Sequence, residues 1–364
     1  MQISAITSYL ESIAPLSYQE NYDNAGLLTG SLDQNTSQAL ITLDCTEEIV
    51  DEAIQKNCNF IIAHHPIIFT GLKKLNGKNY IERTIIKAIK NDIAIYALHT
   101  NLDNVHNGVN AKICEKLGLI NTQILAPKTG FLKKLVAFCP TEHADKVRNA
   151  LFEAGAGYIG NYDNCSFNAV GNGTFRGLAN SNPFVGEPNQ QHTEAEVKIE
   201  TIFAAHLQPK LIKTLLAVHP YEEVAYDIIP LDNTYKNIGA GIIGELQTPV
   251  NELFFLKTIK EKFHTKGIRY THLLNKEVKK VAVCGGSGSF LLQDAIAQKA
   301  NIFITADFKY HQFFDANNRI VIADIGHYES EQYTKDLIFD LIKEKFPNFA
   351  VRLSEINTNP INYL

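Results

Sequence analysis

Short apolar runs alternate with longer amphipathic stretches along the first third of the chain. The runs 39–44, 59–65 and 93–99 are typical of buried strands, because they are almost continuously apolar before they end in polar residues. The stretches 46–57 and 80–91 between them repeat apolar residues at helical spacing. Strands that alternate with helices in this way predict βαβ units and a largely parallel sheet.

The last third of the chain repeats this alternation. The expected elements are a strand at 279–286, a helix at 289–300, strands at 301–307 and 319–327, and a closing helix from Tyr328 to about Glu344. Both ends of the chain are therefore predicted to be α/β.

An internal repeat links these two parts. Aligning residues 51–64 with residues 294–307 without a gap gives six identities in fourteen positions. In both copies the apolar strand ends in polar residues, and the next strand along the chain ends in a histidine, His99 or His327. The pattern predicts that the core arose by duplication.

The composition changes between the two copies. Residues 160–193 are rich in Asn, Gly and Ser, and the flanking segments have the patterns of strands and helices. The resulting order of strand, helix, strand, strand, helix and strand is typical of a ferredoxin-like domain. We therefore expect an α/β fold with a duplicated βαβ core, residues 1–125 and 242–364, interrupted by an inserted ferredoxin-like α+β domain at 126–241.

Composition and charge exclude several classes of protein. With 364 residues, of which 45% are hydrophobic, the chain can form folded domains rather than a disordered tail. Its formal net charge of −5 argues against a general nucleic-acid or anionic-membrane binder, which needs a basic face. No apolar run reaches the roughly 18 residues that cross a bilayer. The N-terminus lacks the order of a secretory signal and the six cysteines are scattered, so we expect a cytoplasmic protein with reduced thiols.

Side chains that bind metals follow three of the predicted strands. They are His64 and His65, the segment from His99 to Asp103, and the segment from His327 to Glu331. Because ligands gather beyond the carboxyl ends of parallel strands, we expect these side chains to share one rim of the core. If a helix follows Gly326, His327 and Glu331 are four residues apart and project from one face of it.

Histidine nitrogens and carboxylate oxygens without thiolates suit zinc, manganese or iron. Five such groups are more than one tetrahedral ion needs, so two divalent ions about 3.5–4 Å apart, sharing a carboxylate, are the economical interpretation. Each piece also has a plainer interpretation. A strand-end histidine pair can be a hydrogen-bonded surface feature, Asp103 can stabilise a turn, and His327 can cap a helix.

Two further stretches are candidates for the same site. The glycine-rich segment 284–289 follows a strand and is predicted to open a helix, where backbone amides can cradle phosphate. The segment 305–311 occupies the place of the histidine pair in the second repeat. Lys309 and His311 within it are candidates for a phosphate contact and a proton donor, and a solvated loop is the alternative.

The chain resembles the dinuclear metal-centre proteins of the NGG-interacting-factor-three-like family, whose members carry the label GTP cyclohydrolase type 2 homologue. The resemblance covers nearly the whole chain. The motifs that carry it are YDNAGL at 22–27, AHHP at 63–66, HTNLD at 99–103, GGSG at 285–288, TADFKYH at 305–311 and GHYESE at 326–331. Tyr22 stands where the family usually has Trp, a departure expected to affect packing and not the metal.

The resemblance implies a ligand set, an assembly and a kind of insert. The implied metal ligands are His64, His65, Asp103, His327 and Glu331, with a carboxylate bridging the two ions. The implied assembly is a toroidal homohexamer with its metal sites facing an inner cavity. The insert is similar to PII and CutA-type domains, and because many members lack it, a regulatory or architectural role is expected.

The leading functional hypothesis is a metal-dependent hydrolase of a nucleotide or related phosphorylated small molecule. The ions would activate water for attack on an electrophilic carbon or phosphorus. The family label implies attack at a purine C8, and a flanking His311 would handle the proton. The alternative is a metal-binding scaffold or regulator without turnover, whose insert binds an effector. A phosphoesterase or nuclease is a third hypothesis, which the acidic net charge disfavours.

Overall fold

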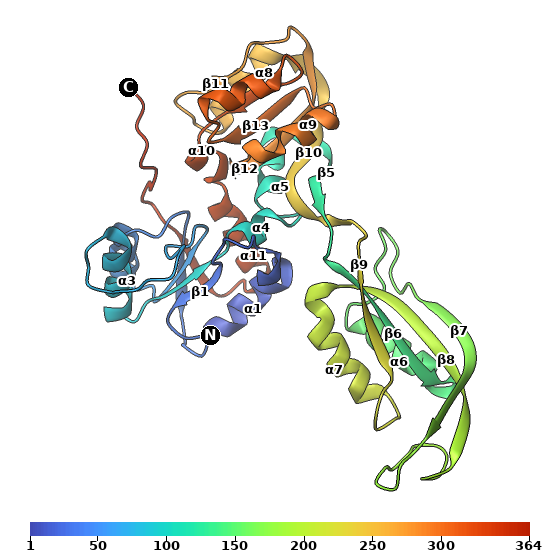
Figure 1. Cartoon of the computed structure of the whole chain (residues 1–364). Coiled ribbons are helices and arrows are strands. Elements are labelled where there is room, and N and C mark those ends of the chain that lie inside the picture. Colours follow the sequence, from blue (N-terminus) through green and yellow to red (C-terminus); the bar gives the residue numbers. More distant parts are fainter. The chain divides into compact units, whose positions relative to one another are not determined.

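The computed structural model describes all residues, 1–364. The chain forms two compact units, one made of residues 1–127 with 236–364 and the other of residues 128–235 (Figure 1). We call the first unit the core and the second the insert. The chain leaves the core at strand β5 (Leu119–Lys128) and returns to it at strand β10 (Tyr235–Asn251). These two strands are neighbours in one sheet of the core, so the insert begins and ends at adjacent positions.

The N-terminal half of the core contains a five-stranded sheet. Its order is β1-β4-β3-β2-β15, with β1 (Gly26–Thr29), β4 (Ala94–Ala97), β3 (Phe60–Ala63), β2 (Gln38–Thr42) and β15 (Ala350–Leu353). All neighbours are parallel except β1, which runs antiparallel to β4. Strands β3 and β4 are buried along their whole length, as expected for a parallel sheet covered on both faces.

The helices of this half lie between the strands as the sequence predicts. Helix α2 (Glu47–Gln55) joins β2 to β3, and helix α3 (Tyr80–Lys90) joins β3 to β4. Each begins at a polar cap, because the side chains of Thr46 and Asn79 accept hydrogen bonds from backbone amides of the first turn. The predicted βαβ units are confirmed.

The C-terminal half contains a six-stranded sheet in the order β11-β14-β13-β12-β10-β5. The strands not yet placed are β11 (Arg269–Tyr270), β12 (Glu277–Ser287), β13 (Ile302–Ala306) and β14 (Val321–Asp324). Strands β12, β13 and β14 are parallel, and β11 is antiparallel to β14. The order β11-β14-β13-β12 thus repeats the order β1-β4-β3-β2, which is the expected duplication.

Two predictions for this half are wrong in detail. The closing helix is two helices, α10 (His327–Glu331) and α11 (Thr334–Lys345), because a two-residue turn at 332–333 separates them. The glycine-rich segment 284–289 leads into a helix as predicted, but the first turn of that helix is 3-10 and the helix ends three residues early. The segment extends β12 through Ser287, the 3-10 turn follows at Ser289–Leu291, and it continues directly as α9 from Leu292 to Ala297.

The remaining helices of the core are α1 (Ile3–Ile13), α4 (Thr100–Asp103), α5 (Val109–Leu117), α8 (Glu252–Lys262) and α9 (Leu292–Ala297). None of the helices in the chain is both long enough and apolar enough to cross a membrane. All six cysteines are free, and five of them are buried.

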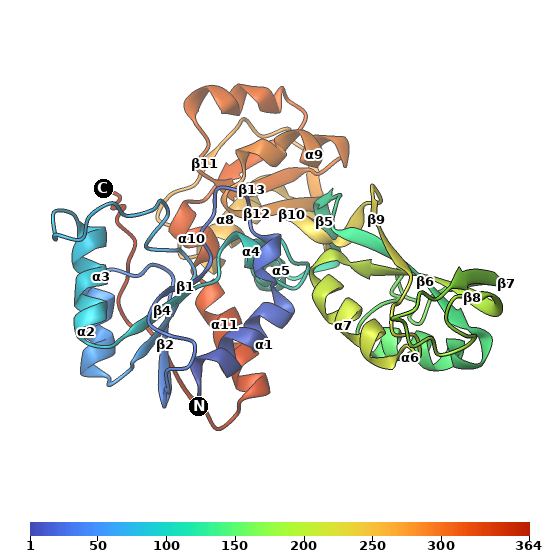
Figure 2. The same cartoon turned by 60° about the horizontal axis from the view of Figure 1, so that its bottom comes forward.

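The insert is a four-stranded antiparallel sheet with two helices. The elements are β6 (Leu132–Pro140), α6 (Ala144–Glu153), β7 (Phe167–Arg176), β8 (Gln191–Ala204), α7 (Gln208–Val218) and β9 (Tyr226–Leu231), which is the predicted order (Figure 2). The sheet order is β7-β8-β6-β9. Apolar residues of both helices, such as Val147 and Leu211, pack in one cluster with Leu135 and Val197 of the sheet. One face of the sheet is therefore covered by the helices.

Candidate metal centre

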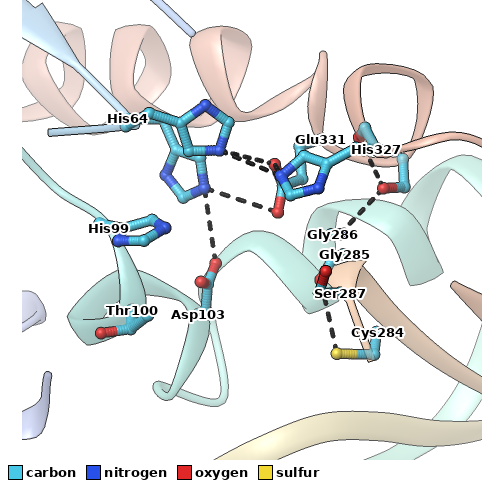
Figure 3. Close-up of polar contacts among 12 residues, drawn as sticks. His64, His99, Thr100, Asp103, Cys284, Gly285, Gly286, Ser287, His327 and Glu331 are labelled. Carbon is cyan, nitrogen blue, oxygen red and sulfur yellow. Dashed lines mark hydrogen bonds and ion pairs between the residues drawn. The ribbon is translucent and has the colours of Figure 1, made fainter. Parts of the chain in front are cut away.

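His64 directly follows strand β3 and is fully buried. Its Nδ1 donates a hydrogen bond to the backbone carbonyl of Leu98, 2.7 Å away. This bond fixes the ring so that Nε2 faces two carboxylates (Figure 3). Nε2 lies 3.7 Å from Oδ1 of Asp103 and 3.8 Å from Oε1 of Glu331.

His65 and His327 are held in the same way from the other side of Glu331. Nδ1 of His65 is 2.8 Å from Oδ1 of Asp44, and Nδ1 of His327 is 2.6 Å from Oδ2 of Asp307. Their Nε2 atoms lie 3.0 Å and 3.1 Å from Oε2 of Glu331, and 3.4 Å from each other. Both rings therefore direct one nitrogen to a common centre, and each outer carboxylate sets the orientation.

Glu331 lies at the middle of the cluster, and its side chain is only 3% exposed. It comes four residues after His327 on α10, which is the predicted i, i+4 pair. Two glycines of strand β12 make room for it. A Cβ atom on Gly286 would lie 2.4 Å from Oε1 of Glu331, and one on Gly285 would lie 3.2 Å from its Cγ. The glycine-rich motif therefore admits a carboxylate, which is a different use from the predicted phosphate cradle.

Two buried polar atoms at this centre have no hydrogen-bond partner, namely Nε2 of His64 and Oδ1 of Asp103. Leaving such groups unpaired costs about 1–3 kcal/mol each, and more for a charged group. A cation between them would satisfy both. The donor set of imidazole nitrogens and carboxylate oxygens suits a divalent metal ion, so the residues fit the ions that the sequence predicts.

The pKa shifts in the cluster reflect its crowded charges. Burial lowers the pKa of His65, but the hydrogen bonds to Asp44 and Glu331 outweigh it and raise the pKa to about 10. For His327, the carboxylates of Glu331 and Asp307 outweigh burial and raise the pKa to about 11. Without a metal, these two histidines thus carry protons that partly neutralise the carboxylates.

The two inner carboxylates shift in opposite directions. Burial and the nearby charge of Glu331 raise the pKa of Asp103 well above its usual range. Burial also raises the pKa of Glu331, but the charge and hydrogen bonds of the surrounding histidines reverse the effect and lower it. His64 is fully buried, and burial lowers its pKa so that the neutral imidazole is favoured. A neutral imidazole is the form that binds a metal ion.

His99 is a further member of the cluster that the predicted ligand set leaves out. Its ring centroid lies 5.4 Å from those of both His64 and His65, and its nitrogen groups with theirs. Asp23 holds the other side of this ring, with 2.7 Å between Nδ1 and Oδ1. The hydrogen bond from His99 outweighs burial and lowers the pKa of Asp23 to about 2.

The predicted ligand set does not include the carboxylates that orient these rings, Asp23, Asp44 and Asp307, although Asp307 lies in the candidate segment 305–311. Asp44 and Asp307 each follow a parallel strand, β2 and β13, so their position beyond a strand end was the available signal. Asp23 precedes β1 in the motif at 22–27, which the resemblance marks without assigning it a role.

A cavity of about 490 Å³ opens onto the cluster. It reaches His65, Asp103, His327 and Glu331, and its walls include the aromatic side chains of Tyr22, Phe69, Phe290 and Tyr328. The rings of Tyr22 and Phe69 are stacked, with centroids 6.5 Å apart and planes within 13° of parallel. Tyr22 is 66% exposed at this mouth.

Lys309 and His311 are not among the residues that line this cavity. Both are exposed, and the ring of His311 contacts Tyr310 and Phe314 instead. The structure brings the five predicted ligands together and leaves these two apart from them. Their predicted roles in proton transfer and phosphate contact stay predictions.

Cys284 lies beside the cluster, but its sulfur is not among the ligand atoms that group together there. Burial, together with the charges of Asp103 and Glu331, raises the pKa of its thiol far above neutrality. The protonated thiol donates weakly to the carbonyl of Gly285, 3.4 Å away. The site therefore consists of nitrogen and oxygen ligands, as the sequence predicts.

Comparison with known proteins places this arrangement in a family. The Duf34/NIF3 (NGG1p interacting factor 3) model matches residues 1–360. A Bacillus subtilis protein named GTP cyclohydrolase 1 type 2 homolog is 38% identical over 99% of this chain and 98% of its own length. The crystal structure of a Bacillus cereus protein related to NIF3 has a TM-score of 0.86 and 41% identity, covering 100% of this chain and 99% of that one.

A Staphylococcus aureus protein, SA1388, has the same fold over 100% of this chain and 99% of its own, with a TM-score of 0.78 and 31% identity. The match thus includes the core and the insert together. The chain belongs to the Duf34/NIF3 family.

Proposed function

We propose that the cluster is a dinuclear metal centre. His64, Asp103 and one oxygen of Glu331 would hold one divalent ion, and His65, His327 and the other oxygen of Glu331 would hold the second. The observation that carries this proposal is that Nε2 of His64 and Oδ1 of Asp103 are buried without partners on one side of a carboxylate that meets two more histidines on its other side. The ions would be zinc, iron or manganese.

We propose further that the centre serves a metal-dependent hydrolase of a nucleotide or related phosphorylated small molecule. Two bound ions would supply an activated water and polarise the group under attack. The cavity of about 490 Å³ is within the usual range for small-molecule sites. The name that several relatives share, GTP cyclohydrolase 1 type 2 homolog, supports a purine nucleotide as the first substrate to test.

The residues around the cavity suggest how such a substrate is held. The exposed faces of Tyr22 and Phe69 offer apolar contact to a planar base. His99 lies on the cavity wall, and because Asp23 holds its Nδ1, its other nitrogen is directed inward and can accept or give a proton there. His311 and Lys309 remain proposals as the proton donor and phosphate contact, and neither lines the cavity.

The assembly and the domain boundary are also proposals. We infer a homohexamer that encloses the metal centres, in a cytoplasmic protein without membrane or nucleic-acid partners. Light scattering should then give a mass near six times 40.6 kDa. The insert, predicted at 126–241, should be separable, because the core strands at its two ends are neighbours. Core residues 1–125 joined to 242–364 by a short Gly/Ser linker should stay folded and keep the metals.

The function is tested by screening the protein for turnover. The chain is purified with its native metal, reconstituted in parallel with zinc, iron and manganese, and assayed on GTP, other nucleotides and simple phosphoesters. Turnover that disappears in Glu331→Gln supports the hydrolase. Two bound ions with no turnover on any substrate would instead favour the metal-binding scaffold or regulator.

A further inference from the structure

A second cavity lies entirely within the insert and has no part in the metal centre. Its volume is about 500 Å³, and its walls come from β6, β7 and β8, from the segment 177–184 that follows β7 and from the segment before β9. The lining has four aromatic residues, Phe138, Phe175, Phe184 and Tyr221. The charged side chains that line it are mostly carboxylates, Glu196, Glu222 and Glu223, and Arg176 is the one positively charged side chain in the lining.

Glu196 is the buried polar group of this cavity, with 9% of its surface exposed. One of its oxygens, Oε1, accepts a hydrogen bond from the hydroxyl of Tyr221 at 2.9 Å. The other, Oε2, has no hydrogen-bond or ion-pair partner in the protein, and it is not among the fully buried atoms that lack one, so it reaches the open space of the cavity. A carboxylate oxygen can accept two hydrogen bonds. Oε2 is therefore available to a ligand's donor.

The backbone is shaped to keep the carboxylate in this position. A Cβ atom on Gly173, on the neighbouring strand β7, would lie 2.0 Å from Oε2 of Glu196. Any other residue at 173 would displace the carboxylate. Glycine at this point thus gives Glu196 the space to lie against the strand, as the glycines of β12 do for Glu331.

The aromatic wall is also fixed in position. The ring centroid of Tyr221 is 6.0 Å from that of Phe175 and 6.3 Å from that of Phe184. The backbone N–H of Tyr221 donates to Nδ1 of His219, whose Nε2 donates to the carbonyl of Phe138. Burial lowers the pKa of His219, which favours the neutral ring that this pattern requires. His219 thus positions Tyr221 and does not itself line the cavity.

The charge of the cavity points to one class of ligand. Lysine is absent from its lining, and no lysine, arginine or histidine forms an ion pair with Glu196. An anion would meet three carboxylates. A transition-metal ion would find no histidine or cysteine in the lining, and His143 and His192, whose rings contact Phe184 and Phe175, lie outside it. An organic cation would pair with Glu196 and lie against aromatic faces, which attract positive charge.

We propose that this cavity of the insert binds a small organic cation, an amine, amidine or guanidine with an apolar or aromatic body. Its N–H groups would donate to the free oxygen of Glu196, and its body would contact Phe175, Phe184 and Tyr221. This site stands apart from the proposed metal centre, and its occupancy does not depend on bound metal.

The test uses the full-length protein and two probes of nearly the same shape, benzamidine, which is a cation, and benzamide, which is neutral. Binding is measured by calorimetry, and intermolecular NOEs locate the probe. We expect benzamidine to bind at least about tenfold more tightly than benzamide, since a charge-assisted hydrogen bond is stronger than a neutral one. The NOEs should reach the rings of Phe175 and Phe184.

The variants separate the charge from the aromatic wall. Glu196→Gln keeps an acceptor for the hydroxyl of Tyr221 and should abolish the preference for benzamidine over benzamide. Phe184→Ala should weaken the binding of both probes. Glu153→Gln, an exposed carboxylate on α6, is the matched control and should change nothing. The proposal is overturned if benzamidine does not bind, if both probes bind equally, or if the preference survives in a folded Glu196→Gln protein. If that variant does not fold, the probe pair and the NOEs on the unmodified protein decide.

Discussion

The two halves of the core place the same pair of residue types after equivalent strands, and use them differently. After β4 come His99 and Asp103, and after β14 come His327 and Glu331, each pair four residues apart. Glu331 contacts two histidines within about 3.1 Å, whereas the nearest histidine to Asp103, His64, is 3.7 Å away. The second half therefore supplies the central carboxylate, and the first half supplies a carboxylate that lies farther from its nearest histidine.

The ends of β3 and β13 differ in a complementary way. His64 follows β3 and turns a nitrogen to the centre, while Asp307, its aligned position after β13, holds His327 from behind. One copy of the repeat thus gives a group that faces the centre, an inner group, and the other gives a group that orients an inner one, a supporting group. A duplicated scaffold can therefore build an asymmetric site. The residue at one position faces the centre in one copy, and its equivalent in the other copy orients a neighbouring histidine.

The largest effect is expected for Glu331→Gln. Because the two oxygens of Glu331 face different histidines, this variant should lose most of both ions, which elemental analysis would show as a fall from about two ions per chain toward zero. Glu329→Gln is the control and should keep both ions, because Glu329 lies on the same helix but accepts a hydrogen bond from Asn359 instead. Full metal content in Glu331→Gln would contradict the bridging role.

His64→Ala should lose one ion and keep the other. Its nitrogen belongs to the Asp103 side of the cluster, and the pair of His65 and His327 on the opposite side is untouched. Elemental analysis should therefore give about one ion per chain. His311→Ala should retain both ions, because that histidine lies outside the cavity. Loss of both ions from His64→Ala would mean that the two halves do not form separable subsites.

Metal affinity should rise with pH, because bound metal displaces the protons of His65 and His327, whose pKa values are raised to about 10 and about 11. The expected gain is about tenfold per pH unit for each proton released. Stability of the metal-free protein should change in the opposite sense. The contribution of these histidines is full below pH 6.5 and is lost as the pH rises through about 10.

Competition with a chelator and denaturant unfolding at several pH values measure the two trends. The variant His65→Gln, which cannot gain a proton at this position, should show a weaker pH dependence of both metal affinity and stability. A metal affinity that is independent of pH would show that these histidines are already neutral before the ions bind.

A smaller effect than these is expected for Asp307→Asn, which tests the carboxylate that orients His327. The amide can still accept a hydrogen bond from His327 but no longer carries a charge, so metal affinity should fall about 10–100-fold. Ser287→Ala removes only the hydroxyl that donates to Asp307 and should have a weaker effect. Equal losses for Asp307→Asn and His64→Ala would erase the distinction between supporting and inner groups.

The sequence predicts the centre well where it depends on position along a strand. His64, His65 and the pair of His327 and Glu331 follow apolar strands, and the period of the helix places the last two on one face. The rest depends on contacts between distant segments. Asp23 reaches His99 across 76 residues, and nothing in the local pattern around Asp23 indicates that contact.

The glycine-rich segment shows why a motif can mislead. A turn before a phosphate site and a strand that approaches a carboxylate both need residues without side chains. At Gly286 the deciding fact is the position of Glu331, which lies 45 residues later in the chain and comes from a different element. The break of the closing helix after Glu331 was likewise not predicted, because the residues at 332–333 include neither Gly nor Pro.

Strand β15 has a consequence for how the protein is made. It pairs in parallel with β2, so Ala350 faces Gln38 across the sheet, although the two are separated by almost the whole chain. During synthesis the N-terminal sheet therefore has an uncovered edge at β2 until residues 350–353 have left the ribosome, and such edges invite pairing with other chains. We expect the nascent chain to depend on chaperones, and truncation before residue 350 to favour aggregation over a smaller folded product.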